Sequence, residues 1–319
     1  MKPLRLIPEK TTVPFIKVRY AAYLVSAFAI LASLLLVATR GINFGIDFVG
    51  GTIIEVKTDG PADLARIRTI VGGEVEGQVA VQEFGQPDEV LIRIATQPVT
   101  EELDEAGAQQ AARSRVETAL GAAFPGLRVM RSEVIGPKVS GELVRAGTLA
   151  VLLAIAAMFF YLLFRFEWQF STGAVLALIH DVTITIGIFA LLQLEFTLSI
   201  IAALLTIVGY SMNDTVVVYD RVRENFRKYK KMPLEELLDL SMNDTLSRTV
   251  MTSGTTLIAL GALYILGGQV IRDFTFAMIW GIVIGTYSSI FVAAPLLLIL
   301  EPRRDWSGFE TKSAGIHLQ

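Results

Sequence analysis

The chain has 319 residues, of which 53% are hydrophobic and 18% are charged, and its mean hydropathy of +0.55 is higher than an ordinary soluble domain needs. A formal net charge of −3 argues against a nucleic-acid binder that depends on overall basicity. The absence of cysteine excludes disulfide frameworks, thiolate metal sites and cysteine nucleophiles, so the composition favours a membrane protein.

Six runs of the chain are apolar enough to cross a bilayer as helices, which takes about twenty residues. The predicted spans are residues 20–39, 146–164, 173–192, 196–219, 250–271 and 274–300. Ionisable residues interrupt two of them, because His180 and Asp181 lie in the third and Asp214 lies in the fourth. A signal peptide is the alternative for the first run. Its apolar stretch exceeds the roughly 7 to 15 residues of a signal core, so we expect a retained span.

The distribution of Lys and Arg predicts how these spans are oriented. Basic residues crowd the segments before the first span, after the fourth and after the sixth, whereas the two hairpins on the opposite side carry one between them. By the positive-inside rule, both termini face the cytoplasm. The predicted parts are a cytoplasmic segment 1–19, an extracytoplasmic domain 40–145, the five spans of 146–300 with a cytoplasmic loop 220–249, and a cytoplasmic tail 301–319.

The interval between the first two spans is predicted to form a small α+β domain. Strands are expected at 52–57, 79–84, 90–95 and 127–134, and helices at 61–71 and 100–120. The order βαββαβ is that of the ferredoxin-like split unit. Turn residues at 85–88 separate the middle strands, and Pro125 with Gly126 ends the second helix.

Glycines mark two further features of the sequence. Gly45, Asp47, Gly50 and Gly51 follow the first span, where glycine permits positive φ or close backbone approach, so we expect a tight connection from the membrane to the sheet. In the sixth span, the G-x-x-x-G pair at 281 and 285 predicts a face for close helix packing.

Asp214 is the strongest candidate for a functional residue, because an ionisable group at bilayer depth is costly unless it faces a partner or a water-filled interior. Helical spacing places Tyr210 and Ser211 near its face, which suits an inward surface. A structural hydrogen bond or a helix-end carboxylate that reaches for water is the alternative. The pentapeptide Ser-Met-Asn-Asp-Thr at 211–215 recurs at 241–245 in a polar setting, so we expect only the first copy to titrate.

Asp181 lies near the middle of the third span, and for it a structural and a functional role are both open. His180 should point about 100° away from Asp181 and pack or hydrogen-bond between helices.

Arg248 precedes the fifth span and is the candidate counter-charge for a titrating carboxylate, because an approaching cation lowers the pKa of a carboxyl group. Thr252 continues its stripe one turn later, with the threonines at 255 and 256 beyond it. An arginine that snorkels to the cytoplasmic headgroups is the alternative.

The sequence contains no phosphate-binding loop, no H-E-x-x-H and no G-x-S-x-G. We therefore predict no enzyme, no metal and no cofactor, and we expect any work to come from a gradient or a partner.

Three motifs carry a resemblance to a known family: residues 45–51, residues 209–225, and residues 245–249 with 252–256. Over essentially its whole length the chain resembles the SecD/SecF family, and within it the SecF subunits of the bacterial Sec protein-export machinery, half-length relatives of the resistance-nodulation-division transporters. The resemblance implies a multi-pass protein of the cell inner (cytoplasmic) membrane. It also implies a SecD-like partner that supplies the other six spans, and a SecYEG channel, with YajC- or YidC-type accessory proteins as further partners.

The resemblance also implies a function and a set of residues for it. The proton motive force is used to help complete preprotein translocation, with Asp214 and Arg248 in the proton pathway, Asp181 as a further member, and Asn213, Tyr210 and Thr252 in support. We hypothesise that protonation of Asp214 weakens its link to Arg248 and lets the two six-span halves rearrange.

Three alternatives remain at the level of sequence. A proton-coupled exporter of lipids or small hydrophobic molecules would use the same intramembrane charges. Tyr219 and Asp220 resemble part of an intramembrane aspartyl protease motif, but the sequence has no G-x-G-D partner motif. A passive assembly scaffold predicts that neutralising Asp214 changes nothing.

Overall fold

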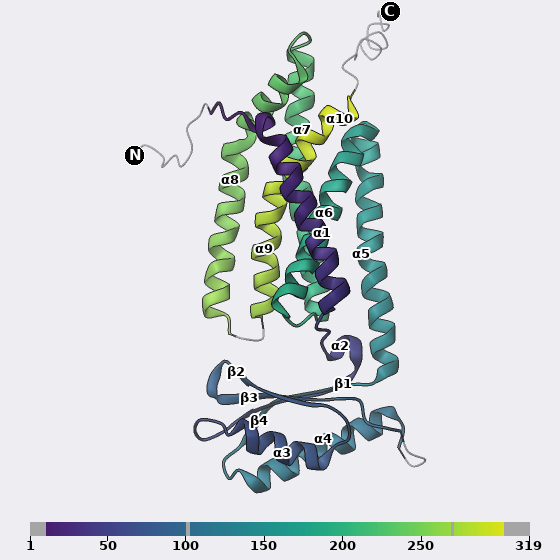
Figure 1. The fold of residues 1–319 in the computed structure, drawn as a ribbon, viewed down its shortest axis with the longest axis vertical. Coiled ribbons are helices and arrows are strands. Elements are labelled where there is room, and N and C mark those ends of the chain that lie inside the picture. The colour runs from purple at the N-terminus through teal and green to yellow at the C-terminus, as the bar shows by residue number, and fades with distance from the viewer. Residues whose placement is uncertain (1–10, 100–102, 269–270, 303–319) are drawn as a thin grey trace, which may run out of the picture.

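The computed structural model describes residues 11–99, 103–268 and 271–302 of the chain. A bundle of long helices carries a small α+β domain at one end, and the first residues of α1 and the last residues of α10 lie at the other end (Figure 1). The short helix α2 (Ile46–Val49) joins α1 to the sheet.

Within the described ranges, six helices are long and apolar enough to cross a membrane. They are α1 (Arg19–Arg40) after the 3-10 turn η1 (Phe15–Val18), α5 (Pro137–Arg165), α6 (Trp168–Leu192), α7 (Leu198–Lys228), α8 (Leu234–Leu266), and α9 (Arg272–Ser288), which continues through the π-helical turn η2 (Ser289–Ala293) into α10 (Ala294–Leu300). Each overlaps one predicted span. The prediction of a polytopic helical membrane protein is therefore confirmed.

Several helices extend past the apolar runs that predicted them. Most of the predicted loop 220–249 is helical, because α7 continues to Lys228 and α8 already begins at Leu234. The acidic first turn of α8 favours a helix start there, since carboxylates stabilise the positive end of the helix dipole. The fifth span was predicted to reach residue 271, but α8 ends at Leu266 before two glycines, and residues 269–270 lie outside the described chain.

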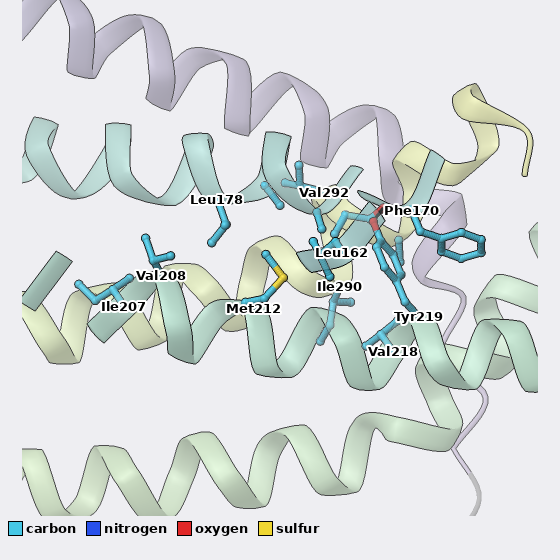
Figure 2. Packing of buried hydrophobic residues seen from close by; sticks show 14 of the residues in the cluster. Leu162, Phe170, Leu178, Ile207, Val208, Met212, Val218, Tyr219, Ile290 and Val292 are labelled. Carbon is cyan, nitrogen blue, oxygen red and sulfur yellow. Dashed lines mark hydrogen bonds between the residues drawn. The ribbon is translucent and has the colours of Figure 1, made fainter. Parts of the chain in front are cut away.

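The bundle has a central and a peripheral set of helices. In the most apolar stretch of α6, 56% of the positions are buried, and the share is 50% for α7 and for α9 with α10. The share is only 17% for α1 and 11% each for α5 and α8. Figure 2 shows the core that the central helices share with α5, built from Leu162, Phe170, Leu178, Ile207, Val208, Met212, Val218, Tyr219, Ile290 and Val292. The third and fourth spans, which hold the ionisable residues, are thus both central.

The predicted glycine pair brings α9 close to α7. A Cβ atom at Gly281 would collide with Ile207, and one at Gly285 would lie 2.9 Å from the Cβ of Ser211. The expectation of close helix packing is therefore confirmed. It places α9 against the helix that carries Asp214.

The sheet domain consists of four antiparallel strands in the order β2-β3-β1-β4. In chain order its elements are β1 (Gly51–Lys57), α3 (Leu64–Glu74), β2 (Val79–Phe84), β3 (Gln86–Ile94), α4 (Glu105–Ala123) and β4 (Arg128–Ile135). Both helices pack on the face of the sheet that points away from the bundle (Figure 1). The opposite face points toward the membrane helices.

Two boundaries in this domain differ from their predictions. The turn predicted over 85–88 is confined to Gly85 (φ +88°), and β3 already begins at Gln86. Pro87 fits into the strand because it lacks only the donor, and its carbonyl accepts from the N–H of Ala62 at 2.9 Å. The helices begin later than predicted, because Asp63 and Asp104 cap them; residues 100–102 of the second predicted helix lie outside the described chain.

Candidate functional site

Asp214 lies on α7 with 7% of its surface exposed. Its Oδ1 accepts a hydrogen bond of 2.5 Å from the hydroxyl of Thr249 on α8. Its Oδ2 is buried and has no hydrogen-bond partner of normal geometry among the described residues, although the hydroxyl of Ser289 lies near enough to act on the carboxyl. A buried carboxyl oxygen without a well-placed donor is costly, so this side chain favours either a bound proton or a partner that has yet to arrive.

Arg248 is the residue before Thr249, but its side chain is exposed. No ion pair within 4.0 Å joins it to Asp214 in the part of the chain that the structure describes. The guanidinium acts on the carboxyl at longer range, and the group in direct contact is the Thr249 hydroxyl. The link between Asp214 and Arg248 that the sequence suggested is therefore not formed in this conformation.

The three residues predicted to support Asp214 lie in different settings. The hydroxyl of Tyr210 donates to Thr256 Oγ1 at 3.3 Å and so bridges α7 and α8. Thr252 is exposed and donates within its own helix, to the carbonyl of Arg248 at 3.0 Å. Asn213 is also exposed. Only Tyr210 therefore makes an interhelical contact near the site.

Asp181 on α6 is fully buried and forms hydrogen bonds with three side chains. His180 Nδ1 lies 2.9 Å from its Oδ1, while Ser211 Oγ and Ser288 Oγ donate to its Oδ2 at 2.6 and 2.8 Å. His180 was predicted to point about 100° away from Asp181, yet its ring nitrogen is in hydrogen-bond contact with the Asp181 carboxyl group. The predicted interhelical hydrogen bond is present, since His180 Nε2 lies 3.2 Å from Ser26 Oγ on α1.

The junction of α9 with the π-helical turn η2 supplies two serines that the sequence reasoning missed, Ser288 as the last residue of α9 and Ser289 as the first of η2. Ser288 binds Asp181, and the adjacent Ser289 shares a hydrogen bond of 2.9 Å with Thr215, the neighbour of Asp214. π-helical turns occur frequently at functional sites. The sequence signal was a pair of consecutive serines inside an otherwise apolar span.

The two copies of the repeated pentapeptide lie in the different environments that were predicted. Asp244, in the second copy, is exposed and its Oδ2 lies 2.9 Å from Arg221. Asp214, in the first copy, is buried and has no such cation in contact. The identical local sequences thus give a surface ion pair and a buried carboxyl.

The glycine segment after α1 joins the sheet to the loop between α6 and α7. Gly45 N–H donates to Phe196 O at 2.9 Å, and Asp47 Oδ2 accepts from the N–H of Leu198 at 2.8 Å, where α7 begins. Gly50 (φ +74°) and Gly51 (φ +123°) have conformations that favour glycine, and a Cβ at Gly51 would lie 2.5 Å from Ile94 O. The predicted tight connection is confirmed, and Asp47 also caps α7.

Glu195, in the same loop, forms an ion pair with Arg93 on β3. Burial raises the pKa of Glu195; Arg93 opposes this rise, and the carboxylates of Asp273 and Asp47 add to it. These acidic groups lie at a cavity of about 330 Å³ between the sheet and the bundle. The pair therefore ties the sheet directly to the connection that leads into α7.

In the described ranges, no group of three His, Asp or Glu side chains is placed to hold a metal ion. The chemistry that the arrangement offers is the binding and release of protons by buried carboxyl groups, next to helix contacts that depend on their charge.

Two family models match the sequence. The model "Protein export membrane protein SecD/SecF, C-terminal" matches residues 115–303, and the model "SecD/SecF GG Motif" matches residues 35–62, which contain the glycine segment.

Curated relatives match the chain over most of its length. The Protein translocase subunit SecF of Rhodobacter capsulatus is 47% identical over 309 residues, covering 93% of this chain and 91% of the relative. That of Magnetococcus marinus is 48% identical and covers 94% and 95%. That of Vibrio alginolyticus is 42% identical and covers 93% and 92%.

Two solved structures share the fold. The crystal structure of SecDF, a translocon-associated membrane protein from Thermus thermophilus, matches with a TM-score of 0.82 at 35% identity, over 94% of this chain and 40% of the solved chain. SecDF in a super-membrane-facing form matches with a TM-score of 0.65 at 36% identity, over 97% and 41%. The chain thus spans about two fifths of the solved SecDF chain.

Proposed function

The chain belongs to the SecD/SecF family of protein-export membrane proteins, and on that basis we propose that it uses the proton motive force to help complete preprotein translocation. It is an accessory subunit of the Sec translocase and an integral membrane protein, in keeping with its SecF relatives. The proposed partners are a SecD-like subunit, the SecYEG channel, YajC- or YidC-type accessory proteins and the preprotein itself.

The proposal places the chain in the cytoplasmic membrane with both termini in the cytoplasm. Residues 40–145 then form an extracytoplasmic ferredoxin-like domain. The element order β1-α3-β2-β3-α4-β4 and the strand order β2-β3-β1-β4 support that domain type. The basic residues at the bundle end away from the sheet support the orientation.

The observation that carries the proposal is the environment of Asp214. Its carboxyl lies in a central helix with one oxygen bound to Thr249 and the other without a hydrogen bond of normal geometry in the described chain. A carboxyl group in this setting gains a partner either by taking up a proton or by attracting a cation. Both are changes that a proton-driven cycle requires.

In the proposed cycle, Asp214 exchanges partners on α8. Protonated Asp214 is held by Thr249, as in the observed conformation, and ionised Asp214 attracts Arg248, the preceding residue of the same helix. Adjacent residues of a helix point about 100° apart, so the exchange requires α8 to rotate or shift. Asp181 is the second protonatable group, one turn of α7 away through Ser211.

Movement of α7 would be transmitted to the sheet through its first turn. Asp214 lies sixteen residues after Leu198, about 24 Å along the helix axis. At that end, Asp47 binds the first turn of α7, and Glu195 in the preceding loop binds Arg93 of the sheet. One proton that crosses 100 mV releases about 2.3 kcal/mol, enough to bias a two-state domain by roughly fiftyfold.

The test is Asp214→Asn in the complex with the SecD-like partner. We expect the variant to assemble normally and to lose the part of preprotein export that an ionophore abolishes in the wild type, because the amide cannot release a proton. The matched control is Asp244→Asn, the same residue of the repeated pentapeptide at an exposed position. Full proton-dependent export by Asp214→Asn would contradict the proposal and favour a passive scaffold.

A further inference from the structure

A continuous chain of hydrogen bonds surrounds the second buried carboxyl group of the bundle. It runs from the carbonyl of Ala22 through Tyr287, Ser26 and His180 to Asp181. The members come from α1, α6 and α9, and the imidazole also stacks on the Tyr287 ring with centroids 6.1 Å apart. Ser26, His180 and Asp181 are buried, so bulk water cannot replace a missing donor.

The order of donors in this chain follows from the number of protons that each group has. The hydroxyl of Tyr287 has one proton and donates it to Ala22 O at 3.1 Å. Ser26 Oγ, 3.2 Å from the Tyr287 oxygen, must therefore donate to it. That uses the only proton of Ser26, so His180 Nε2, at 3.2 Å, must donate to Ser26. His180 consequently carries a proton on Nε2.

This assignment fixes the proton count of the neighbouring contact. His180 Nδ1 and Asp181 Oδ1 are 2.9 Å apart, which requires a proton between them. If Nδ1 holds it, the pair is an imidazolium with a carboxylate; if Oδ1 holds it, both groups are neutral. Either way the pair has no net charge. Without this proton, two acceptors would face each other and a full negative charge would be buried in the bundle.

We propose that His180 and Asp181 form a second proton-binding site, which holds one proton between Nδ1 and Oδ1 in this conformation and releases it when the helices around it move. Its place in the cycle rests on the proposed proton-coupled function. Its charge state rests on the hydrogen bonds alone.

The link between the proton and the helices follows from where the donors come from. Ser211 on α7 and Ser288 on α9 both donate to Asp181 Oδ2, and Ser26 on α1 holds His180. Moving any of these helices removes a bond that favours one charge distribution of the pair, so proton binding and helix packing are thermodynamically linked.

The other titratable groups near the pair are few. Among the described residues, His180 is the only basic side chain within ion-pair distance of Asp181. On the packed elements, α9 offers Tyr287 and Ser288, and α7 offers Ser211 with Asp214 one turn away. Helix α1 offers Ser26. The proton of the pair therefore has no competing cation.

The charge state is tested by 15N NMR of the full chain in lipid bilayers, labelled at histidine and purified through a tag without histidine. The sequence has two histidines, so His317→Gln leaves His180 as the only signal, and His180→Gln in that background identifies it. We expect Nε2 to be protonated and the Nδ1 resonance to report a strong hydrogen bond. An unprotonated Nε2, with the proton on Nδ1 alone, would give the pair a net charge of −1 and overturn the proposal.

The release of the proton is tested by two substitutions in the complex with the SecD-like partner. Asp181→Asn can donate to Nδ1 and accept from both serines, so it mimics the proton-holding state permanently. We expect a thermal midpoint close to that of the wild type and a loss of at least tenfold in proton-dependent export. Asp181→Ala removes every acceptor and should also lower the thermal midpoint.

The outcomes separate this inference from the proposed function. Wild-type export by Asp181→Asn together with defective export by Asp214→Asn would leave proton coupling intact and show that the pair only holds the helices together. Wild-type export by both variants would contradict proton coupling altogether, and this inference with it.

Discussion

Two carboxyl groups of the membrane domain lie in opposite hydrogen-bonding environments. Asp181 shares a proton with an imidazole and accepts from two serines, so both of its oxygens are satisfied. Asp214 has one donor, Thr249, and one oxygen without a hydrogen bond of normal geometry in the described chain. The first environment stabilises a fixed arrangement of four helices, and the second leaves room for a change of partner.

Thr249 should therefore control how Asp214 is held. We expect Thr249→Val, which keeps the shape but removes the donor, to lower proton-dependent export by up to about tenfold, since a hydrogen bond to the neutral, protonated carboxyl is worth roughly 0.5–1.5 kcal/mol. Export rates with and without an ionophore measure the effect. Thr249→Ser keeps the hydroxyl and should stay close to the wild type. Equal defects in both variants would point to packing rather than to the hydrogen bond.

Gly51 should be intolerant of any side chain. We expect Gly51→Ala to destabilise the protein by about 1–3 kcal/mol, because its φ of +123° is strained for alanine and the added Cβ would lie 2.5 Å from Ile94 O. Thermal unfolding of the purified complex measures this. Gly72→Ala is the control, since nothing lies within 4 Å of its Cβ in helix α3, and it should be neutral or stabilising. No difference between the two would contradict the argument.

At the scale of elements, α7 connects the candidate proton site to the sheet. It carries Asp214 in its central part and begins at Leu198, whose N–H is bound by Asp47 of the glycine segment. A long helix moves largely as a unit, so a displacement near Asp214 reaches its first turn. The glycine segment is therefore placed to transmit that displacement to β1.

Asp47 is the residue to test for this transmission. We expect Asp47→Ala to lower the free energy of unfolding by about 1 kcal/mol, because it removes a helix cap. The variant should also export preprotein more slowly, although Asp214 still takes up protons. The measurement pairs the export rate with carboxyl-region infrared spectra of the same samples. Asp47→Asn retains an oxygen acceptor and should restore most of the export. Normal export by Asp47→Ala would rule out this route.

The elements that could be predicted from sequence are those set by local patterns. Apolar runs of about twenty residues predicted all six spans, and glycines at 50 and 51 predicted the tight connection. The predicted start of β3 was wrong because Pro87 lies within the strand, where only its carbonyl group forms a backbone hydrogen bond. The contact of His180 with Asp181 was missed because it depends on Ser26, 154 residues away, which holds the other ring nitrogen. Such contacts depend on tertiary packing, which no local pattern contains.

At the scale of the whole molecule, the sheet domain and the bundle meet at the ion pair of Glu195 with Arg93. Burial raises the pKa of Glu195, so the folded protein binds a proton there more readily than the unfolded chain does. The free energy of unfolding should accordingly fall as the pH rises from the ordinary pKa of glutamate through the raised one. The interface is thus least stable at pH values where the desolvated Glu195 side chain is ionised.

Glu195→Gln tests this dependence. We expect the variant to lose the decline in thermal midpoint that the wild type shows above the ordinary glutamate range, because glutamine does not titrate. Thermal unfolding of matched samples over about pH 4–8 provides the measurement. Glu83→Gln, at an exposed position on β2, is the control and should retain the wild-type slope. Identical slopes for Glu195→Gln and the wild type would contradict the assignment.

The peripheral helices expose apolar surface on the outside of the bundle. Large apolar side chains are exposed along α1, α5 and α8, and Arg248 lies on one of these helices. The chain spans about two fifths of the solved SecDF chain, so these surfaces are the ones available to lipid and to a second half.

The π-helical turn makes the last span sensitive to its own length. Ser288 and Ser289 are neighbours in the chain, yet one binds the carboxyl of α6 and the other binds a hydroxyl of α7. Each residue added to or removed from a helix changes the phase of everything beyond it by about 100°. A single insertion or deletion in α9 just before Ser288 would thus misalign both serines at once, so the spacing of residues here is under as much constraint as their identity.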